Sequence, residues 1–210
     1  MSAPLPPRLF VTGTDTGVGK TVVSAVLLAG RGGHYWKPVQ SGADEDSDSQ
    51  TVARLSGRGP GCLLPEAYRL AAPLSPHRAA LLEGVRIDPA RLALPEVPGG
   101  GPLVVEGAGG VLVPLAPGLL MADLMATLGL PVLVVARSGL GTINHTLLTV
   151  GELRRRALDV AGVVLCGPRD AANREAIESY GQVRVVAELE PLPELCPAAL
   201  RAAWARCFPG

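Results

Sequence analysis

Residues 12–21 read TGTDTGVGKT and lie between a short apolar run at residues 8–12 and a helix-like apolar pattern at residues 20–29. Consecutive backbone N–H groups in such a turn, at the start of a helix, form a concave site for anions. The pattern is a variant, because five residues separate Gly13 from Gly19 where the strict phosphate-binding loop has four. The order of strand, loop and helix nevertheless predicts a site for the phosphates of a nucleotide. The alternative, a glycine-rich turn that only packs tightly, does not explain Lys20.

The residues that end this loop carry the expected chemistry. Lys20 is expected to reach the β- and γ-phosphates, and the Thr21 hydroxyl to ligate Mg²⁺. Lys20 and Lys37 are the only lysines beside seventeen arginines, so each marks a place where a compact ammonium is needed. Lys37 lies in the stretch YWKPVQSG at residues 35–42. The alternative is that these two lysines remain by chance, but both would then have to fall by accident beside glycine-rich or strand-end sequence.

Short apolar runs alternate with helix-length stretches along the rest of the chain. Apolar runs without polar alternation are typical of strands covered on both faces, so we expect an α/β fold with a mostly parallel sheet flanked by helices. The length favours one domain, residues 1–210. The stretch at 57–101, rich in proline and glycine, is expected to be an excursion that covers the site. Further strands are expected at 34–39, 102–105, 131–136, 161–166 and 183–187, and helices at 48–55, 75–82, 120–128, 142–157, 171–180 and 197–206.

The composition excludes several classes of partner. Nineteen acidic and nineteen basic residues balance, with a pI near 6.8, so no basic footprint for nucleic acid or an anionic membrane is present. The four cysteines are widely spaced and form no metal-binding or disulfide pattern. No apolar run has the length of a membrane span or a signal peptide. We therefore expect a cytoplasmic protein with reduced thiols.

Two groups of acidic residues are candidates for binding a metal. Glu106 follows the apolar residues of the stretch LVVEGAGG at 103–110, and the acidic run DEDSD occupies residues 44–48. Ligands of open α/β sheets gather at the carboxyl ends of the strands, and carboxylate oxygens suit Mg²⁺. A solvated turn and a solvated loop are the alternatives. Beside a phosphate-binding loop, Glu106 and Asp48 are the acids expected to bind the metal, and the neighbours of Asp48 are expected at the surface.

Five stretches in combination resemble the dethiobiotin synthase family. They are TGTDTGVGKT at 12–21, KPVQSG at 37–42, SPH at 75–77, VEGAGG at 105–110 and GLGTINHT at 139–146. The resemblance implies a P-loop NTPase-like fold and an ATP-dependent ligase of biotin formation. Its substrates would be 7,8-diaminononanoate, CO₂ and ATP. One amine would capture CO₂ as a carbamate, ATP would phosphorylate the carbamate, and the second amine would close the ureido ring.

The resemblance also implies a role for each matching residue. Lys37 would stabilise charge between carbamate and γ-phosphate, Ser41 would bind the substrate near its amines, and Thr16 would add a hydroxyl. Residues 139–144 would receive the substrate's carboxylate at a helix start contributed by a neighbouring subunit, which implies a homodimer. The expected catalytic residues are Lys37, Lys20 and Thr16; the substrate-binding residues are Ser41, Gly139, Leu140, Gly141, Thr142, Ile143 and Asn144; the nucleotide-binding residues are Gly17, Val18, Gly19, Lys20, Thr21, Val22, Asp48, Glu106, Gly107, Ala108, Gly109 and Pro191; the metal ligands are Thr21, Asp48 and Glu106.

One departure from the family pattern bears on the nucleotide base. Many members place Asn after the strand at 161–164, but this chain has Cys166, which cannot make a paired donor and acceptor contact with adenine. We therefore expect other nucleoside triphosphates to be accepted, with the loop at Pro191 contacting the base through its backbone.

Two alternative functions remain open at this point. One is another P-loop amide- or ring-forming ligase, such as a cobyrinate amidase-type synthase without its glutaminase domain. The other is a nucleotide switch of the partitioning or division-site type. Such switches usually carry an additional lysine early in the loop, where this chain has threonine and glycine.

Overall fold

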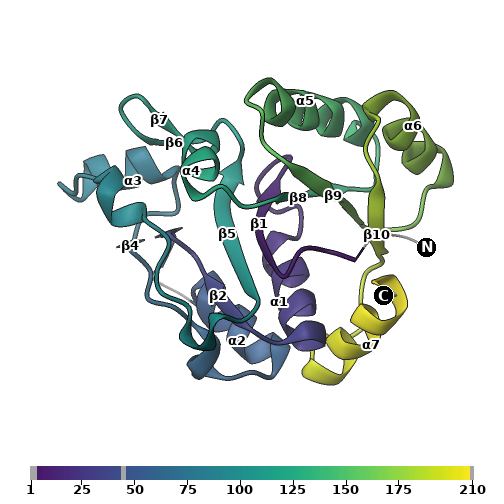
Figure 1. The fold of residues 1–210 in the computed structure, drawn as a ribbon, viewed down its shortest axis with the longest axis horizontal. Coiled ribbons are helices and arrows are strands. Elements are labelled where there is room, and N and C mark those ends of the chain that lie inside the picture. The colour runs from purple at the N-terminus through teal and green to yellow at the C-terminus, as the bar shows by residue number, and fades with distance from the viewer. Residues whose placement is uncertain (1–3, 44–45, 209–210) are drawn as a thin grey trace.

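The computed structural model describes residues 4–43 and 46–208. A six-stranded sheet forms its centre, in the order β10-β9-β8-β1-β5-β2, and every pairing between neighbours is parallel (Figure 1). This confirms the α/β class expected from the unbroken apolar runs. The strands are β1 (Arg8–Gly13), β2 (His34–Trp36), β5 (Leu103–Gly110), β8 (Val132–Arg137), β9 (Val160–Cys166) and β10 (Val185–Leu189).

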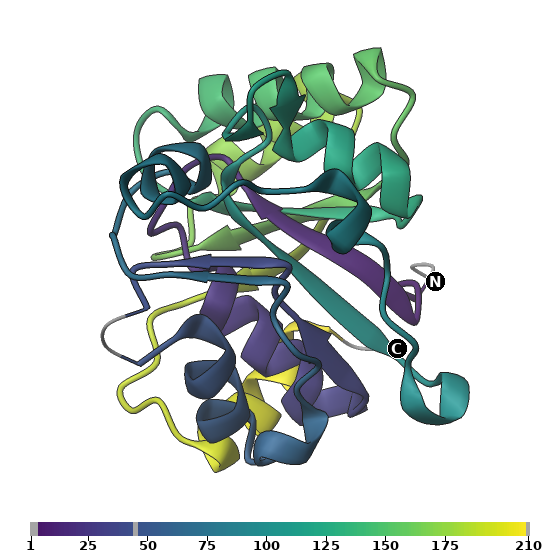
Figure 2. The same cartoon turned by 90° about the vertical axis from the view of Figure 1, so that its left-hand side faces the viewer.

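Helices cover both faces of the sheet (Figure 2). Alternate residues of β1 point to opposite faces, with Leu9 and Val11 in one hydrophobic cluster and Phe10 in the other. The face of Leu9 is covered by α1 (Lys20–Arg31), α2 (Asp48–Ser56) and α7 (Pro197–Cys207), and the face of Phe10 by α4 (Met121–Leu128), α5 (Thr142–Arg155) and α6 (Ala171–Gly181). Both clusters are buried, which is why the strands carry no polar alternation. None of the described helices has the length and apolar character needed to cross a bilayer.

Helices α1 and α7 pack closely because one residue of α1 has no side chain. A Cβ atom at Gly30 would lie 1.9 Å from the ring of Trp204, which itself stacks on Phe208 at 5.1 Å. Helix α7 is thereby held against the helix that starts at the phosphate-binding loop.

The prediction of one continuous strand at 34–39 is wrong, because this segment belongs to two separate strands. Its first half is β2 of the central sheet, while residues Val39–Ser41 form β3, which pairs with β4 (Tyr68–Leu70) in a separate two-stranded sheet. Pro38 has no N–H to continue the first ladder, and its carbonyl accepts hydrogen bonds from Ala67 and Tyr68 at 3.0 and 3.1 Å. Lys37 therefore lies at the break between two sheets.

Other elements differ more modestly from the expectation. Strand β5 continues to Gly110, so Glu106 lies within a strand, and β10 begins two residues later than expected. The excursion at 57–101 contains β4 and α3 (Pro76–Leu82). Elements too short for a periodic pattern were missed: β6 (Pro114–Ala116), β7 (Leu119–Leu120) and the 3₁₀ turns η1 (Pro60–Cys62), η2 (Pro89–Leu92) and η3 (Pro98–Gly100).

Candidate active site

The phosphate-binding loop joins β1 to α1. Gly17 and Gly19 have φ angles of 70° and 104°, which residues with a side chain rarely adopt. Nζ of Lys20 donates to the carbonyl oxygen of Asp15 at 2.9 Å, so the lysine bends back over its own loop. A Cβ atom at Gly13 would lie 2.8 Å from that carbonyl oxygen and 3.1 Å from Nζ of Lys20. Only glycine therefore fits beneath the lysine.

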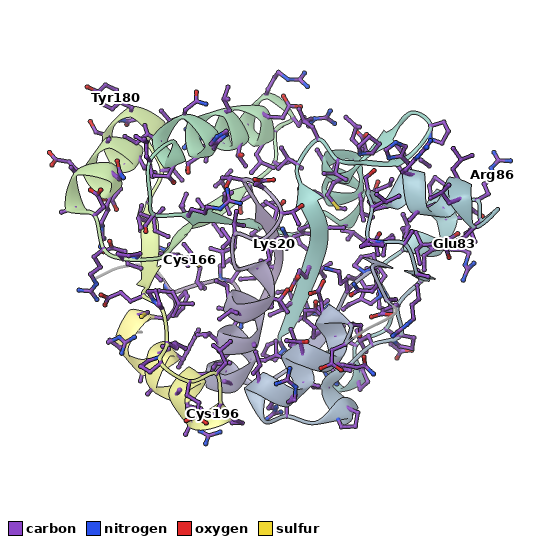
Figure 3. All side chains as sticks on the ribbon, turned by 180° about the vertical axis from the view of Figure 1, so that it is seen from behind. Lys20, Glu83, Arg86, Cys166, Tyr180 and Cys196 are labelled. Atoms are coloured by element: carbon purple, nitrogen blue, oxygen red, sulfur yellow. The ribbon has the colours of Figure 1, made fainter. Side chains whose placement is uncertain are left out.

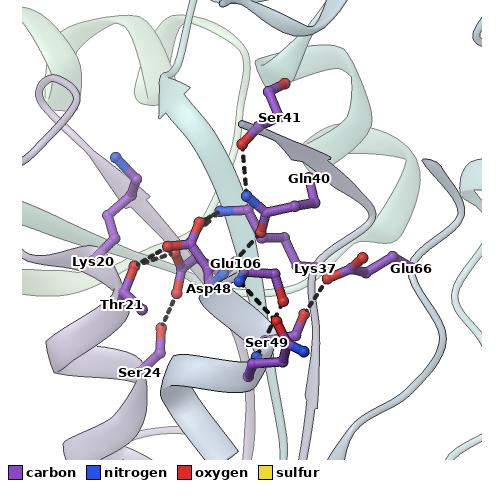
Figure 4. A network of polar contacts seen from close by, with 12 residues as sticks. Lys20, Thr21, Ser24, Lys37, Gln40, Ser41, Asp48, Ser49, Glu66 and Glu106 are labelled. Carbon is purple, nitrogen blue, oxygen red and sulfur yellow. Dashed lines mark hydrogen bonds and ion pairs between the residues drawn. The ribbon is translucent and has the colours of Figure 1, made fainter. Parts of the chain in front are cut away.

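Three elements bring an ammonium and two carboxylates together beside this loop (Figure 4). Nζ of Lys37, which follows β2, lies 2.5 Å from Oδ2 of Asp48 and 3.3 Å from Oε1 of Glu106. The Thr21 hydroxyl lies 2.9 Å from Oδ1 of Asp48 and 3.0 Å from Oε1 of Glu106. Ser24 donates to Oε2 of Glu106 at 2.7 Å. Both oxygens of Glu106 are thus engaged by α1 or by Lys37, and Ser24 is a member of the cluster that the sequence reasoning missed.

The two lysines differ in their electrostatic surroundings. Burial by itself lowers the pKa of Lys37, but the charges of Glu106 and Asp48 outweigh burial, and the pKa is raised. Burial raises the pKa of Asp48, but the Lys37 ammonium outweighs it, and that pKa is lowered. Burial lowers the pKa of Lys20, only partly opposed by the charge of Glu106. Among the described residues Lys20 has no carboxylate within ion-pair distance, so bound phosphates would supply its counter-charge.

The oxygen atoms around Lys37 fit a hard divalent cation. Mg²⁺ is usually bound by one or two carboxylates together with substrate phosphates and water. Asp48, Glu106 and Thr21 offer two carboxylates and a hydroxyl, and the Lys37 ammonium occupies the place where a cation balances them. Residues 4–43 and 46–208 contain no group of three or more His, Cys, Asp or Glu side chains placed to hold a metal. Any ion here would therefore take its remaining ligands from phosphate and water.

The acidic run at residues 44–48 contains three acidic residues besides Asp48. Asp44 and Glu45 lie outside the described residues. Asp46 is exposed and lies 3.7 Å from the guanidinium of Arg54. It lies at the surface, as expected for a neighbour of Asp48.

Ser41 and Asp48 are connected through a glutamine. The Gln40 side chain donates to the carbonyl oxygen of Ser41 at 2.7 Å and accepts from the backbone N–H of Asp48 at 3.0 Å. The hydroxyl of Ser41 is buried and has no hydrogen-bond partner among residues 4–43 and 46–208. An unpaired buried hydroxyl is costly, which suits a group that pairs with a ligand. Gln40 was missed as a site residue, although it stands next to Ser41 in the stretch that carries Lys37.

A cavity of about 510 Å³ unites most of the expected residues. Residues 73–76, from the excursion at 57–101, line it as well, so that segment does cover the site. Residues 73–76 and Val113 were not expected in the lining, although Ser75 and Pro76 belong to the stretch SPH at 75–77 that contributes to the family resemblance. The lining consists of Thr16, Gly17, Gly19, Lys20, Thr21, Val22, Lys37, Ser41, Asp48, Pro73, Leu74, Ser75, Pro76, Glu106, Ala108, Gly109 and Val113.

Some expected residues do not line this cavity. Val18 is buried in the core beside the loop, and a Cβ atom at Gly107 would contact Phe10 at 2.9 Å. Pro191 and residues 139–144 are also absent from the lining. Gly141 has a φ of 90° and α5 begins at Thr142, so the expected glycine turn onto a helix is present. Within one chain it does not reach the cavity.

Cys166 ends β9 close to the phosphate-binding loop (Figure 3). Its Sγ lies 3.2 Å from the position that a Cβ of Gly19 would take. Burial raises the pKa of this thiol to about 12, so it is a neutral, weak hydrogen-bonding group. Asn173, at the start of α6, is another residue with a side-chain amide, and its NH₂ group donates to the carbonyl oxygen of Ser138 at 2.9 Å and to Oδ2 of Asp170 at 3.0 Å.

Comparison with known proteins identifies the family. A family model described as an AAA domain matches residues 7–199. The ATP-dependent dethiobiotin synthetase BioD of Agrobacterium fabrum is 55% identical over 201 residues, which are 96% of this chain and 94% of that protein. The chain belongs to the dethiobiotin synthetase family. A synthetase from Paramagnetospirillum magneticum is 53% identical over 193 residues, 91% of this chain and 92% of its own.

The solved structure of a ParA family ATPase from Chlorobium tepidum shares the fold of this synthetase family member. The TM-score is 0.54 at 10% identity, over 95% of this chain and 97% of that one. At this identity the likeness shows the fold alone. The fold by itself therefore does not distinguish a ligase from a nucleotide switch.

Proposed function

We propose that this protein is an ATP-dependent dethiobiotin synthetase that closes the ureido ring of dethiobiotin from 7,8-diaminononanoate and CO₂. Family membership supports the reaction. The observation that carries the assignment to this site is the position of Lys37 and Ser41, which line the same cavity as Lys20. A nucleotide-hydrolysing loop alone has no need of either residue. We further infer that residues 1–210 act as a single domain, since both hydrophobic clusters lie on one central sheet.

The reaction needs charge to be neutralised more than it needs a proton donor. One amine attacks CO₂ and loses a proton, giving a carbamate. A carbamate oxygen attacks the γ-phosphorus and ADP leaves. The second amine then attacks the carbamate carbon, loses a proton and expels phosphate, which closes the ring. Because the carbamate and the triphosphate are both anions, positioning and preorganised positive charge carry this catalysis.

The residues of the cavity suit these steps. Lys20 would exchange the Asp15 carbonyl for the β- and γ-phosphates. Their negative charge would compensate the buried ammonium for the hydration that it lacks. Lys37, with a raised pKa, stays charged and would stabilise the oxygens between carbamate and γ-phosphate. The unpaired hydroxyl of Ser41 would bind the diamine near its nitrogens, and that of Thr16 would lie at the same centre.

The residues around Lys37 would also hold Mg²⁺. When bound, Mg²⁺ would neutralise charge on the phosphate oxygens. Thr21, Asp48 and Glu106 would hold it, and Ser24 keeps Glu106 oriented through its hydrogen bond.

A second copy of the chain would complete the site. Residues 139–144 start a helix whose N–H groups suit a carboxylate, yet they do not line the cavity of their own chain. Leu140 is fully exposed and Leu148 of the same helix is 64% exposed. A homodimer that buries this end of α5 against the neighbouring cavity would account for both observations.

One assay separates the ligase from the nucleotide switch. ADP release would be measured with MgATP and ¹³C-bicarbonate, with and without 7,8-diaminononanoate, and the product would be identified by mass spectrometry. A ligase releases ADP only when the diamine is present and incorporates one labelled carbon into the ring. ADP release at the same rate with and without the diamine, with no labelled ring product, would contradict the proposal and favour the switch.

A further inference from the structure

Arg137 is the last residue of β8, and its side chain contacts the phosphate-binding loop. Its Nη1 and Nη2 atoms each lie 3.2 Å from Oδ2 of Asp15. Nη2 also donates to the carbonyl oxygen of Thr16 at 3.0 Å. The guanidinium therefore holds the turn at Asp15 and Thr16 by hydrogen bonds to one carboxylate and one backbone carbonyl.

The same turn is held by two other contacts. Oδ1 of Asp15 accepts from the N–H of Thr16 at 2.7 Å, and Nζ of Lys20 donates to the Asp15 carbonyl. The lysine contact cannot persist once Lys20 turns to phosphates. Arg137 and Asp15 do not line the cavity, whereas Thr16 and Gly17 do. Among the described residues, Arg137 thus provides a long-range side-chain contact that can hold the turn while a nucleotide is bound.

We propose that Arg137 is a positioning residue that keeps the turn at Asp15 and Thr16 in the geometry needed to bind nucleotide. The inference rests on the proposed function, because it assigns Arg137 a role in the nucleotide site. A turn held in place before binding avoids the cost of ordering it on binding. The forked guanidinium contacts two different acceptors at once, which a lysine ammonium on a flexible stem does not reproduce.

The backbone of Arg137 has a separate task. Its carbonyl oxygen accepts from the Thr142 hydroxyl at 2.5 Å, at the first residue of α5. A substitution of the side chain leaves that carbonyl in place. Loss of the guanidinium should therefore affect the nucleotide and spare the helix start that we assign to the diamine's carboxylate.

The expected loss is moderate, because the two side chains are 54% and 61% exposed and exposed ion pairs are weak. Arg137→Met should raise the nucleotide Kd and the KM for ATP roughly threefold to tenfold, with the KM for the diamine unchanged. Arg137→Lys keeps the charge but not the fork, so it should lose nearly as much. Asp15→Asn should cost less, because the Thr16 carbonyl contact remains, and the double variant should match Arg137→Met since both act on one contact.

The nucleotide Kd is measured by titration calorimetry with the complete chain in MgCl₂, and the KM values from ADP release. Arg155→Ala is the control, because it removes another exposed guanidinium, 67% exposed, that contacts Glu152 at 2.7 and 2.8 Å on α5. Its affinities should equal those of the wild type. An Arg137→Lys variant with wild-type affinity would show that only long-range charge matters and would overturn the inference. Additive effects of the two substitutions would overturn it as well. A wild type without diamine-dependent turnover would instead overturn the proposed function.

Discussion

Replacing Lys37 by methionine removes the ammonium that balances Asp48 and Glu106 and keeps a side chain of similar length. The Lys37 and Glu106 side chains are 4% and 0% exposed, and Asp48 is 33% exposed. Removing one partner of a fully buried ion pair costs roughly 3–5 kcal/mol. Solvent around Asp48 reduces its share, so we expect a loss of about 2–4 kcal/mol in the free energy of unfolding. For a chain of this length a loss of about 3 kcal/mol lowers Tm by roughly 6–12 °C.

The loss should be reversed by a divalent cation. An ion on Asp48 and Glu106 takes the place of the missing ammonium, so Mg²⁺ stabilises the variant more than it stabilises the wild type, in which the lysine competes for the same oxygens. Denaturant unfolding in EDTA and in rising MgCl₂ measures both effects. Turnover should fall by at least about a hundredfold in Lys37→Met and in Lys37→Arg, the scale for one preorganised electrostatic donor.

Lys20→Met is the matched control, since it removes the other lysine, which contacts a backbone carbonyl and no carboxylate. Burial lowers the pKa of Lys20, so its removal should cost little stability and should not increase the response to Mg²⁺, although nucleotide binding is lost. Equal stability of Lys37→Met and wild type in EDTA, or an equal response to Mg²⁺, would refute the reasoning about this cluster.

The stability difference between wild type and Lys37→Met should also depend on pH in a defined way. The pKa of Asp48 is lowered from 3.8, so its contribution is complete above that value and is lost as pH falls through the folded pKa. The pKa of Lys37 is raised from 10.5, so its contribution is complete below that value and is lost only at higher pH. The difference should therefore be constant at neutral and mildly alkaline pH. It should begin to narrow in acidic solution above the ordinary pKa of Asp48, because burial without the Lys37 ammonium raises the pKa of Asp48 in the variant, and a protonated Asp48 no longer needs the lysine.

Three further predictions address the base, the substrate and the packing. With Cys166 at the end of β9, CTP, GTP and UTP should support turnover within roughly tenfold to a hundredfold of ATP, and kcat/KM at equal triphosphate concentration measures it; a preference for ATP beyond about a thousandfold would mean that another group reads adenine. Ser41→Ala should raise the KM for the diamine without lowering Tm, because the buried hydroxyl has no partner to lose in the described part of the chain; thermal unfolding and steady-state kinetics test both parts, and a marked drop in Tm would contradict it. Gly30→Ala should destabilise the protein by about 1–3 kcal/mol, because its Cβ would lie 1.9 Å from the Trp204 ring. Denaturant unfolding measures this loss, and an unchanged free energy of unfolding would contradict the prediction.

The local chemistry of this protein is legible in its sequence. A phosphate-binding loop needs glycines with positive φ directly before a helix, and those residues are contiguous at 12–21, so Gly17, Gly19 and Lys20 could be assigned without coordinates. The parallel sheet was equally predictable, because each of its strands is buried on both faces and is therefore an unbroken apolar run. Helix α2 could be placed at Asp48 because Ser47 caps it, with Gln50 closing the capping box.

Contacts between distant segments could not be predicted in the same way. The break after β2 depends on β4, which lies some thirty residues further on and offers its backbone to Pro38 and to β3. The pairing of Ser24 with Glu106, and the grip of Arg137 on Asp15 across 122 residues, leave no pattern in the sequence, because a side-chain contact requires proximity in space and no particular spacing along the chain. The pairing of Lys37 with carboxylates was likewise decided by the tertiary structure, which brings Asp48 at the start of α2 and Glu106 within β5 around the ammonium that follows β2.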